Sequence, residues 1–501
     1  MTGTKRPHIV IFNPDQWRGD VLGHMGNPAA VTPVLDSLAE TDAISFRNAF
    51  CQNPVCTPSR CSFMSGWYPH VRGHRTMHHM MAPDEPVLLK QLKDSGYFVW
   101  WGGKNDLVPG EGGFDAYCDV KFAPTEPITP GSNLHAADGW RGEPGGDNYY
   151  SFFAGKCTAP QGEEYIDEDW ALVRGAIEFL EHAPQDRPLC IYLPLLYPHP
   201  PYGVESPYYE CVDRDALPPR IPAPDWEGKP SLLRGIWERQ GIRDWSEERF
   251  TELRAVYYGM CTRVDAQLGM LLDALKRHGM YDDTALFFFS DHGDFTGDYS
   301  LVEKTQNTFE DCLTRVPFLI KPPAWAGVQP GVSDALVELI DFCATAQDWA
   351  GIQPDYTHFG RSLGALVRGD ATEHRDAVFC EGGRRRGEYQ ASEHENLSPT
   401  PDQIYWPRLS LQAFEGEPFY HSKGTMLRTK DFKYVARIDE RDELYDLHAD
   451  PGETVNRIDD PSLAGELAKL RERMLRFYIE TGDQVPIADD EHAFLRSRGA
   501  R

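Results

Sequence analysis

The sequence has no long apolar run and comparatively few positive charges. Within its 501 residues, no stretch approaches the ~18 uninterrupted apolar residues that a membrane-spanning helix needs. Fifty Lys and Arg residues stand against 77 Asp and Glu residues, which leaves a formal net charge of −27 at pH 7. Such an excess of negative charge repels nucleic acid phosphates and anionic membrane surfaces. We therefore expect neither nucleic acid nor a membrane as a partner.

The N-terminal segment lacks the features of a secretory signal. "MTGTKRPHIVIF" passes straight into a strand-like run, without an apolar h-region or a small-residue cleavage site. This predicts a cytoplasmic protein. Reducing compartments keep thiols free, so the 11 cysteines, an odd number, are not expected to form a disulfide framework.

Short apolar runs alternate with helix-like segments, a pattern typical of an α/β fold with a largely parallel sheet. Thr32 is a possible N-cap, with Pro33 at the first helical position. The stretch from about 109 to 163 is rich in Pro and Gly and is predicted to be a loop. The pattern predicts strands at 8–12, 97–101, 188–197 and from 284, and helices at 32–40, 85–96, 167–182 and 257–279.

The composition changes near residue 365, which predicts a catalytic domain at 1–365 and a smaller domain at 366–483. After an irregular stretch to about 415, the second domain is expected to hold antiparallel strands and a terminal amphipathic helix. Residues 484–501 form a polar tail.

The stretch "CQNPVCTPSRCSFMSGWYPH", residues 51–70, contains one cysteine in an unusual setting. Pro58 suits the first turn of a helix, so Cys56 is expected at a helix N-terminus, where free N–H groups and the helix dipole favour negative charge. An arbitrary cysteine is more often a buried, inert thiol. The flanking residues favour a functional role instead.

Cys56-Thr57-Pro58-Ser59-Arg60 resembles the C-x-P-S-R signature of the formylglycine-dependent sulfatases of the alkaline phosphatase superfamily. In that family a separate formylglycine-generating enzyme oxidises the cysteine. The segment "IVIFNPDQWRGD" is similar to the family's first strand, with Asp15 as the metal-binding residue and Gln16 beside it. The segment "SDHGDFTGDYSLVEK" resembles the block that carries two metal ligands and a substrate-binding lysine, here Asp291, His292 and Lys304.

Further segments extend the resemblance over about residues 8 to 480. "GGKNDL" and "LYPHPPY" are similar to the segments that carry a site lysine and a site histidine, here Lys104 and His199, and "ELYDLHADPGETVN" is similar to a C-terminal strand and turn. The resemblance implies a large mixed sheet flanked by helices, with a smaller C-terminal α+β domain built on an antiparallel sheet. The Asp-His pair and the missing export signal place the chain closest to intracellular arylsulfatase, choline-sulfatase and phosphonate-monoester-hydrolase branches.

The chemistry that this resemblance implies explains the oxidised cysteine. A hydrated aldehyde at position 56 is a geminal diol, and a hydroxyl bound to a divalent cation loses its proton near neutral pH. The resulting alkoxide attacks sulfur and forms a covalent sulfate ester. Deprotonation of the second hydroxyl then re-forms the aldehyde and expels sulfate. An unmodified thiol has no second hydroxyl group and cannot expel sulfate in this way.

The resemblance also implies a role for each site residue. Arg60, one helical turn after Cys56, would hold the diol, and Lys104 and Lys304 would neutralise the oxygens of the transferred group. His199 would donate a hydrogen bond or a proton to the leaving-group oxygen. One metal ion is implied, either Ca²⁺ or Mn²⁺ with Mg²⁺ as a further alternative, bound by Asp15, Gln16, Asp291, His292 and position 56.

The sequence departs from the family pattern at Asp106. Where many sulfatases have G-K-x-H, this chain has Gly103-Lys104-Asn105-Asp106. Asp106 either replaces the missing histidine as a hydrogen-bond acceptor, base and substrate-binding residue, or it caps a turn and neutralises Lys104. The usual L-T-G-R is here Met64-Ser65-Gly66-Trp67.

The predicted function is hydrolysis of a small-molecule sulfate monoester, which the retained Lys104 favours. The first alternative is a phosphonate monoester or phosphodiester hydrolase with the same nucleophile, and the second is a noncatalytic binding protein on this scaffold. Homo-oligomerisation is left open. The leaving group is expected to contact the irregular segments 120–165 and 385–425, with Tyr420, His421 and Lys423 as weak candidates.

Overall fold

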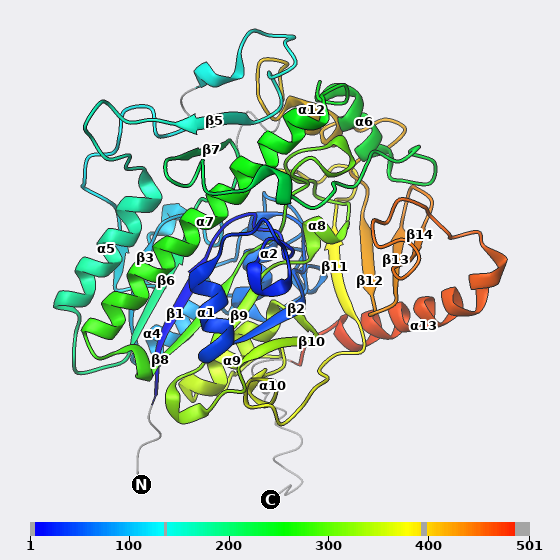
Figure 1. Cartoon of the computed structure of the whole chain (residues 1–501). Coiled ribbons are helices and arrows are strands. Elements are labelled where there is room, and N and C mark those ends of the chain that lie inside the picture. The colour runs from blue at the N-terminus through cyan, green and yellow to red at the C-terminus, as the bar shows by residue number, and fades with distance from the viewer. Residues whose placement is uncertain (1–5, 135–137, 392–397, 486–501) are drawn as a thin grey trace, which may run out of the picture.

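An eight-stranded mixed sheet forms the centre of the molecule (Figure 1). The computed structural model describes residues 6–134, 138–391 and 398–485. Within the sheet β9 runs antiparallel to both of its neighbours, and all other neighbouring strands are parallel. The predicted α/β class with a large mixed sheet is confirmed. In spatial order the strands are β10 (Gly331–Glu338), β2 (Ile44–Phe50), β9 (Phe318–Lys321), β8 (Thr284–Phe289), β1 (His8–Asn13), β6 (Leu189–Pro194), β3 (Phe98–Gly102) and β4 (Val120–Phe122).

Helices cover both faces of this sheet, so its central strands are apolar on both sides. In β1, Ile9 and Ile11 enter one hydrophobic core, while Val10 and Phe12 enter the other. The first core is closed by α2 (Cys56–Ser65), α4 (Leu88–Asp94) and α9 (Ile340–Ala350). The second is closed by α1 (Pro33–Thr41), α5 (Glu168–His182) and α7 (Glu247–Arg277).

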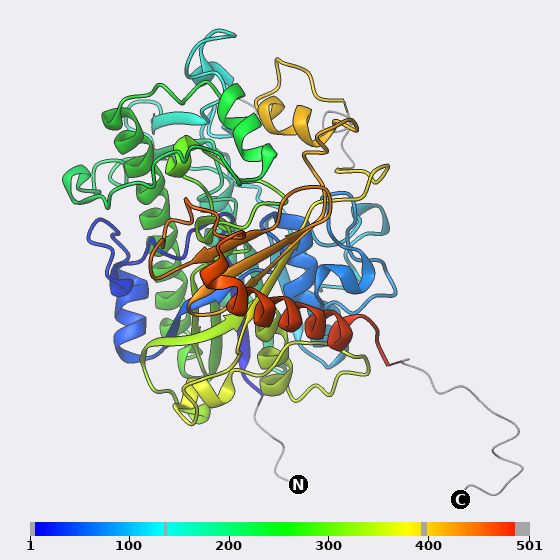
Figure 2. The ribbon, with the colours of Figure 1, turned by 90° about the vertical axis from the view of Figure 1, so that its right-hand side faces the viewer.

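A second, antiparallel sheet occupies the C-terminal part of the chain, as predicted. It consists of β11 (Val378–Gly382), β12 (Gly424–Arg428), β13 (Phe432–Arg437) and β14 (Glu443–Asp446). Helix α13 (Ala464–Thr481) crosses its outer face (Figure 2). On β11, Val378 and Cys380 join the core of the large sheet, while Phe379 packs with α13. The two sheets therefore share a core, and the domain boundary near 365 stays a prediction.

Long-range pairing creates elements that the local sequence pattern did not predict. Within the predicted loop 109–163, β5 (Phe153–Cys157) pairs with β7 (Tyr202–Glu205). Helix α12 (Trp406–Gln412) packs on α6 (Ser231–Arg239), although the stretch to residue 415 was predicted to be irregular. Among the described residues, the remaining α-helices are α3 (Pro69–Arg72), α8 (Asp311–Thr314) and α10 (Gly364–Arg368).

Two helix N-termini also differ from the prediction. Helix α7 begins at Glu247 rather than near 257, because two acidic residues in its first turn favour a helix start there. Thr32 precedes α1, but its side chain bonds to Gly23 N and Asp36 and does not cap the helix. The carboxylate of Asp265, from α7, accepts the N–H groups of Val34 and Leu35 instead.

The eleven cysteines are all free thiols. No helix in the described part of the chain is both long enough and apolar enough to cross a membrane. Residues 486–501, which make up most of the predicted tail, lie outside the described residues.

The packing of Phe477, in α13, against the C-terminal sheet leads to a prediction about stability. The Phe477 ring stacks on Phe379, with ring centroids 3.8 Å apart, and meets Tyr68 edge-on at 4.7 Å. We expect Phe477→Ala to lower the free energy of unfolding by about 3–5 kcal/mol, the usual cost of deleting a buried aromatic ring. Chemical denaturation measures this change. Leu475→Ala, on the exposed face of the same helix, is the control and is expected to change stability by less than about 0.5 kcal/mol; equal effects of the two variants would contradict the packing described.

Candidate active site

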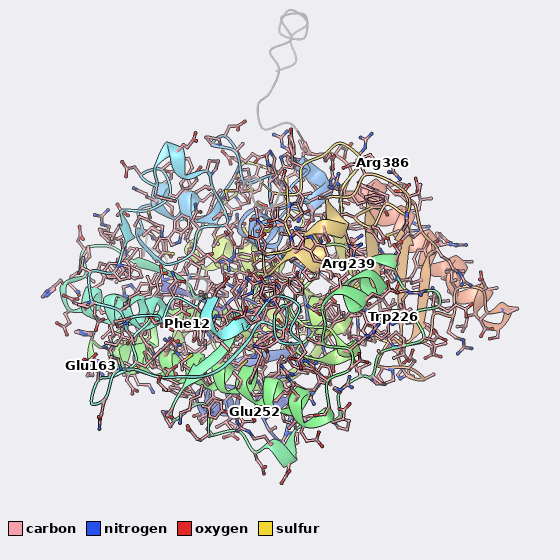
Figure 3. All side chains as sticks on the ribbon, turned by 90° about the horizontal axis from the view of Figure 1, so that it is seen from above. Phe12, Glu163, Trp226, Arg239, Glu252 and Arg386 are labelled. Carbon is pink, nitrogen blue, oxygen red and sulfur yellow. The ribbon has the colours of Figure 1, made fainter. Side chains whose placement is uncertain are left out.

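Neighbouring strands of the large sheet end together, and polar residues follow them. Asp15 comes just after β1, Asp291 just after β8, and Lys104 just after β3. Figure 3 looks from above onto this end of the sheet, with Phe12 of β1 labelled. Ligand sites in α/β folds form at the carboxyl ends of strands, and these side chains converge there.

Cys56 is the first residue of α2, as predicted, and it is buried beside ionisable side chains. Its Sγ atom is 3.2 Å from His292 Nε2 and 3.6 Å from Asp15 Oδ1. The ligand atoms of Asp15, Cys56, Asp291 and His292 all lie within 4.8 Å of one another. Burial, reinforced by Asp15, raises the pKa of the Cys56 thiol to about 12.

His292 presents an unprotonated ring nitrogen to this cluster. Its Nδ1 lies 3.0 Å from the carbonyl oxygen of Gly293, so Nδ1 is the nitrogen that donates. Burial lowers the pKa of His292, which favours the neutral ring. A neutral imidazole with a fixed tautomer is the form that binds a metal ion.

The two carboxylates of the cluster are paired with neighbouring cations. Arg60 Nη2 lies 3.0 Å from Asp15 Oδ2 and 2.8 Å from Asp291 Oδ2. Burial alone would raise the pKa of Asp15, but Lys104, His199 and Arg60 hold it well below its usual value. Two carboxylates and one imidazole suit an oxygen-preferring divalent cation such as Ca²⁺ or Mn²⁺. The residues present therefore fit the predicted metal.

Arg60 forms ion pairs and hydrogen bonds with residues that surround Cys56. Besides the two carboxylates, its Nη1 donates to Asn13 Oδ1 at 3.1 Å and to Tyr192 Oη at 3.3 Å. Asn13 in turn donates to the carbonyl oxygen of Phe289 at 2.9 Å. Arg60 thus ties α2 to the ends of β1 and β8. A direct contact between Arg60 and a modified residue 56 stays a prediction.

Gln16 links the cluster to Lys304. Its Oε1 accepts from Lys304 Nζ at 2.5 Å, its Nε2 donates to Asp294, and its backbone N–H donates to Asp291 Oδ1 at 3.2 Å. Burial disfavours the charged amine of Lys304, but its surroundings, which include the Glu303 carboxylate at 3.0 Å, raise its pKa above the usual value. Lys304 therefore remains charged beside position 56. The amide oxygen of Gln16 is engaged by Lys304, so its place among the metal ligands stays a prediction.

Lys104 and Asp106 form an ion pair at the partly open side of the cluster. Lys104 Nζ lies 2.9 Å from Asp106 Oδ2, 2.7 Å from Asp15 Oδ2 and 3.5 Å from Cys56 Sγ. Burial disfavours the charged amine, but Asp106 and Asp15 raise the pKa of Lys104 well above its usual value. Of the two roles considered for Asp106, the structure shows the contact that neutralises Lys104. A role as a base stays a prediction.

The loop after β6 brings His199 to the same region. His199 Nδ1 lies 2.6 Å from the carbonyl oxygen of Pro200 and therefore donates to it. Asp169 of α5 supports this loop by accepting the N–H groups of Leu196 at 2.9 Å and Tyr197 at 2.8 Å.

Sequence reasoning missed several supporting residues. Asp294 accepts hydrogen bonds from Gln16 and from Tyr202 Oη, and its position three residues after Asp291 was a signal that could have identified it. Asn13 and Asp169 had no distinguishing pattern.

The three weak candidates lie just before β12. Tyr420 packs on Phe414 with ring centroids 6.1 Å apart, and burial, with Arg384 next in effect, holds the pKa of His421 well below its usual value. Burial also lowers the pKa of Lys423. Among the described residues, no contact joins these three to the metal-ligand cluster, and their contact with substrate stays a prediction.

The cluster gives a prediction about metal binding. We expect the wild-type protein to bind about one Ca²⁺ or Mn²⁺ ion, and we expect Asp291→Asn to weaken that binding by at least ~10-fold because it removes a charged ligand. Equilibrium dialysis followed by elemental analysis measures both. Asp282→Asn, an exposed carboxylate at the opposite end of β8, is the matched control and should bind as the wild type does. Unchanged binding in Asp291→Asn would place the metal elsewhere.

Comparison with known proteins finds sulfatases that align with most of this chain. An arylsulfatase from Clostridium perfringens (strain 13 / Type A) is 27% identical over 467 residues, which cover 87% of this chain and 92% of that protein. A choline-sulfatase from Rhizobium meliloti (strain 1021) is 27% identical over 480 residues, which cover 91% and 83%. The solved structure of a phosphonate monoester hydrolase of Agrobacterium radiobacter matches with a TM-score of 0.71 at 22% identity, over 95% of this chain and 96% of that one, a likeness of fold alone.

A protein-family model described as Sulfatase matches residues 7–352 of this chain. The matched residues include β1, the Cys56 helix and the Asp291-His292 pair. The chain therefore belongs to the sulfatase family, a family of sulfuric ester hydrolases in the alkaline phosphatase superfamily, as its motifs predicted.

Proposed function

We propose that this protein hydrolyses a sulfate monoester of a small molecule, after formylglycine-generating enzyme has converted Cys56 to formylglycine. The observation that carries the proposal is the position of Cys56 at the start of α2, with Sγ 3.2 Å from His292 Nε2 and 3.5 Å from Lys104 Nζ. A thiol with a pKa of about 12 is protonated at neutral pH and is a poor nucleophile. Hydrated formylglycine supplies a hydroxyl group in its place.

The metal completes the proposed site. Asp15, Asp291 and His292 would hold one divalent cation, with Gln16 and position 56 as the remaining members of the predicted ligand set. When bound, the cation lowers the pKa of an oxygen nucleophile and stabilises developing negative charge.

The chain's own residues have distinct tasks in this proposal. Lys104 and Lys304, both held protonated, bind the anionic oxygens of the ester and stabilise charge that builds up in the transition state. In its doubly protonated form, His199 would donate the Nε2 proton to the oxygen of the departing alcohol, while Nδ1–H stays hydrogen-bonded to the carbonyl oxygen of Pro200. Arg60 orients the carboxylates of Asp15 and Asp291, and Asp106 orients Lys104.

The relatives support sulfate as the transferred group. Two proteins that align with most of the chain are an arylsulfatase and a choline-sulfatase, whereas the likeness to a phosphonate monoester hydrolase is one of fold. Lys104 also matches the lysine that sulfate-ester hydrolases retain. A cytoplasmic location belongs to this proposal as well.

The modification is tested directly by peptide mass spectrometry. In protein produced together with an active formylglycine-generating enzyme, we expect residue 56 to carry an aldehyde or its hydrate, and we expect activity to rise with the converted fraction. Cys61, in the same helix, serves as an internal control and should remain a thiol. Full activity in protein whose residue 56 is only a thiol would refute the mechanism.

Substrate class is tested with two esters of the same leaving group. We expect kcat/KM for 4-nitrophenyl sulfate to exceed that for 4-nitrophenyl phenylphosphonate. A preference for the phosphonate of more than ~10-fold, or about 1.4 kcal/mol of transition-state discrimination, would establish the phosphonate hydrolase instead. Metal and ester binding without turnover of either compound would indicate a noncatalytic binding protein.

A further inference from the structure

Lys304, Glu303 and Arg408 form a charged triad beside the candidate active site. Glu303 Oε1 lies 3.0 Å from Lys304 Nζ, and Glu303 Oε2 lies 3.0 Å from Arg408 Nη1. The side chains of Lys304 and Glu303 are buried, and that of Arg408 is only 14% exposed, so salt screens these ion pairs weakly. Lys304 Nζ also lies 2.5 Å from Gln16 Oε1, next to the cluster of candidate metal ligands.

Arg408 reaches the triad from an element far away in the sequence. It belongs to α12, in a segment whose sequence pattern predicted no regular structure. Helix α12 packs on α6, and Arg239, which ends α6 and is labelled in Figure 3, donates to Ser410 Oγ at 3.1 Å. Helix α6 therefore supports the helix that carries Arg408.

The backbone at Glu303 is held in an unusual conformation. Its φ angle is 68°, in the left-handed region that residues other than glycine rarely adopt. Gln240, just after α6, bonds to both the N–H and the carbonyl oxygen of Val302 at 3.2 Å, and the N–H of Glu303 donates to Tyr202 Oη at 2.9 Å. Such conformations persist where several contacts hold them, and they cluster at functional sites. The residue fixed in this way directly precedes Lys304.

Arg408 also changes the charge balance around Lys304. Burial alone would raise the pKa of Glu303, but Arg408, and after it Lys304, hold that pKa below its usual value, so the carboxylate is ionised. Glu303 and Lys304 together carry no net charge, whereas the triad carries one net positive charge. In a chain with a net charge of −27, an anionic ester needs positive charge supplied at the site itself. Arg408 supplies that surplus.

We propose that Arg408 is a positioning residue for the sulfate group: it pairs with Glu303 and so leaves the charge of Lys304 available to the bound ester. The inference rests on the proposed function, because it concerns the lysine proposed there to bind the ester's oxygens. Arg408 acts through Glu303 and Lys304 and does not itself contact the ester. Its second contact, from Nη1 to the carbonyl oxygen of Lys304 at 3.3 Å, fixes the backbone of that lysine.

The test uses the metal-loaded, formylglycine-containing protein. For each variant, kcat and KM are measured with 4-nitrophenyl sulfate, and the inhibition constant is measured for inorganic sulfate. We expect Arg408→Gln to lower kcat/KM at least ~10-fold, mainly through KM, and to weaken inhibition by sulfate to a similar degree, because the lost charge acts on the bound anion. Arg408→Lys keeps the charge and should stay within about threefold of the wild type.

A double variant separates charge from packing. Glu303→Gln combined with Arg408→Gln removes the carboxylate that would otherwise neutralise Lys304, so we expect its KM to lie at least ~3-fold below that of Arg408→Gln alone. A role in packing alone predicts that the second substitution adds to the damage. If circular dichroism shows that Arg408→Gln does not fold, Glu303→Gln alone decides: it should lower KM, and a raised KM would overturn the inference.

Arg239→Gln is the matched control. It also removes an arginine between α6 and α12, but Arg239 is exposed and bonds to Ser410 rather than to Glu303. Its kcat/KM should change less than twofold. An active wild type with no loss in Arg408→Gln, equal losses in the Gln and Lys variants of Arg408, or a double variant no better than Arg408→Gln would overturn this inference alone. A wild-type protein that hydrolyses no sulfate ester would overturn the proposed function and this inference with it.

Discussion

Two buried carboxylates impose the constraint on which the site depends. Asp15 and Asp291 have no exposed surface, and ionised groups in a protein interior must be paired. Arg60 lies within 3.0 Å of both carboxylates, and Lys104 lies 2.7 Å from Asp15. Removing one partner of such a buried pair typically costs about 3–5 kcal/mol. These ion pairs keep the two carboxylates in place at the site where a cation could bind. They therefore also hold the start of α2 against the ends of β1, β3 and β8.

A second set of buried ion pairs attaches the C-terminal sheet to the segment that carries Lys304. Lys433 of β13 lies 2.8 Å from Asp311, and Arg428 of β12 lies 3.0 Å from the same carboxylate. Lys229 lies 2.9 Å from Glu310. Because Glu310 and Asp311 lie only a few residues after Lys304, these contacts help to position the lysine that we propose binds substrate. The C-terminal sheet is thus part of the support of the site.

The candidate active site and the surface around it are built from different kinds of structure. Asp15, Asp291 and His292, which could hold a metal ion, follow strands of the central sheet, so their spacing is set by rigid elements. A cleft lined by Trp140 and Tyr405 is formed by connecting segments on the surface, where sequence can vary without disturbing the core. A family with one chemistry and many substrates is expected to keep the first and change the second.

The fold class, the central strands and the family motifs could be predicted from the amino-acid sequence alone. Continuous apolar runs such as that of β1 predict buried strands from local pattern alone, and the motifs around Cys56, Asp15 and Asp291 predict a shared site because parallel strands end at the same edge. Local pattern could not predict β5 or α12, since both form through contacts with distant segments.

Only the tertiary structure decided how the site's side chains pair. The sequence left Asp106 with two roles, and the fold brings its carboxylate 2.9 Å from Lys104. Gln16 stood beside a metal ligand in the sequence, yet its amide meets Lys304. Arg408 carries no motif, and it pairs with Glu303 because two segments that are distant in the sequence pack together. Hydrogen bonds and ion pairs depend on distances of about 3 Å, which sequence spacing specifies within a helix or strand but not between remote segments.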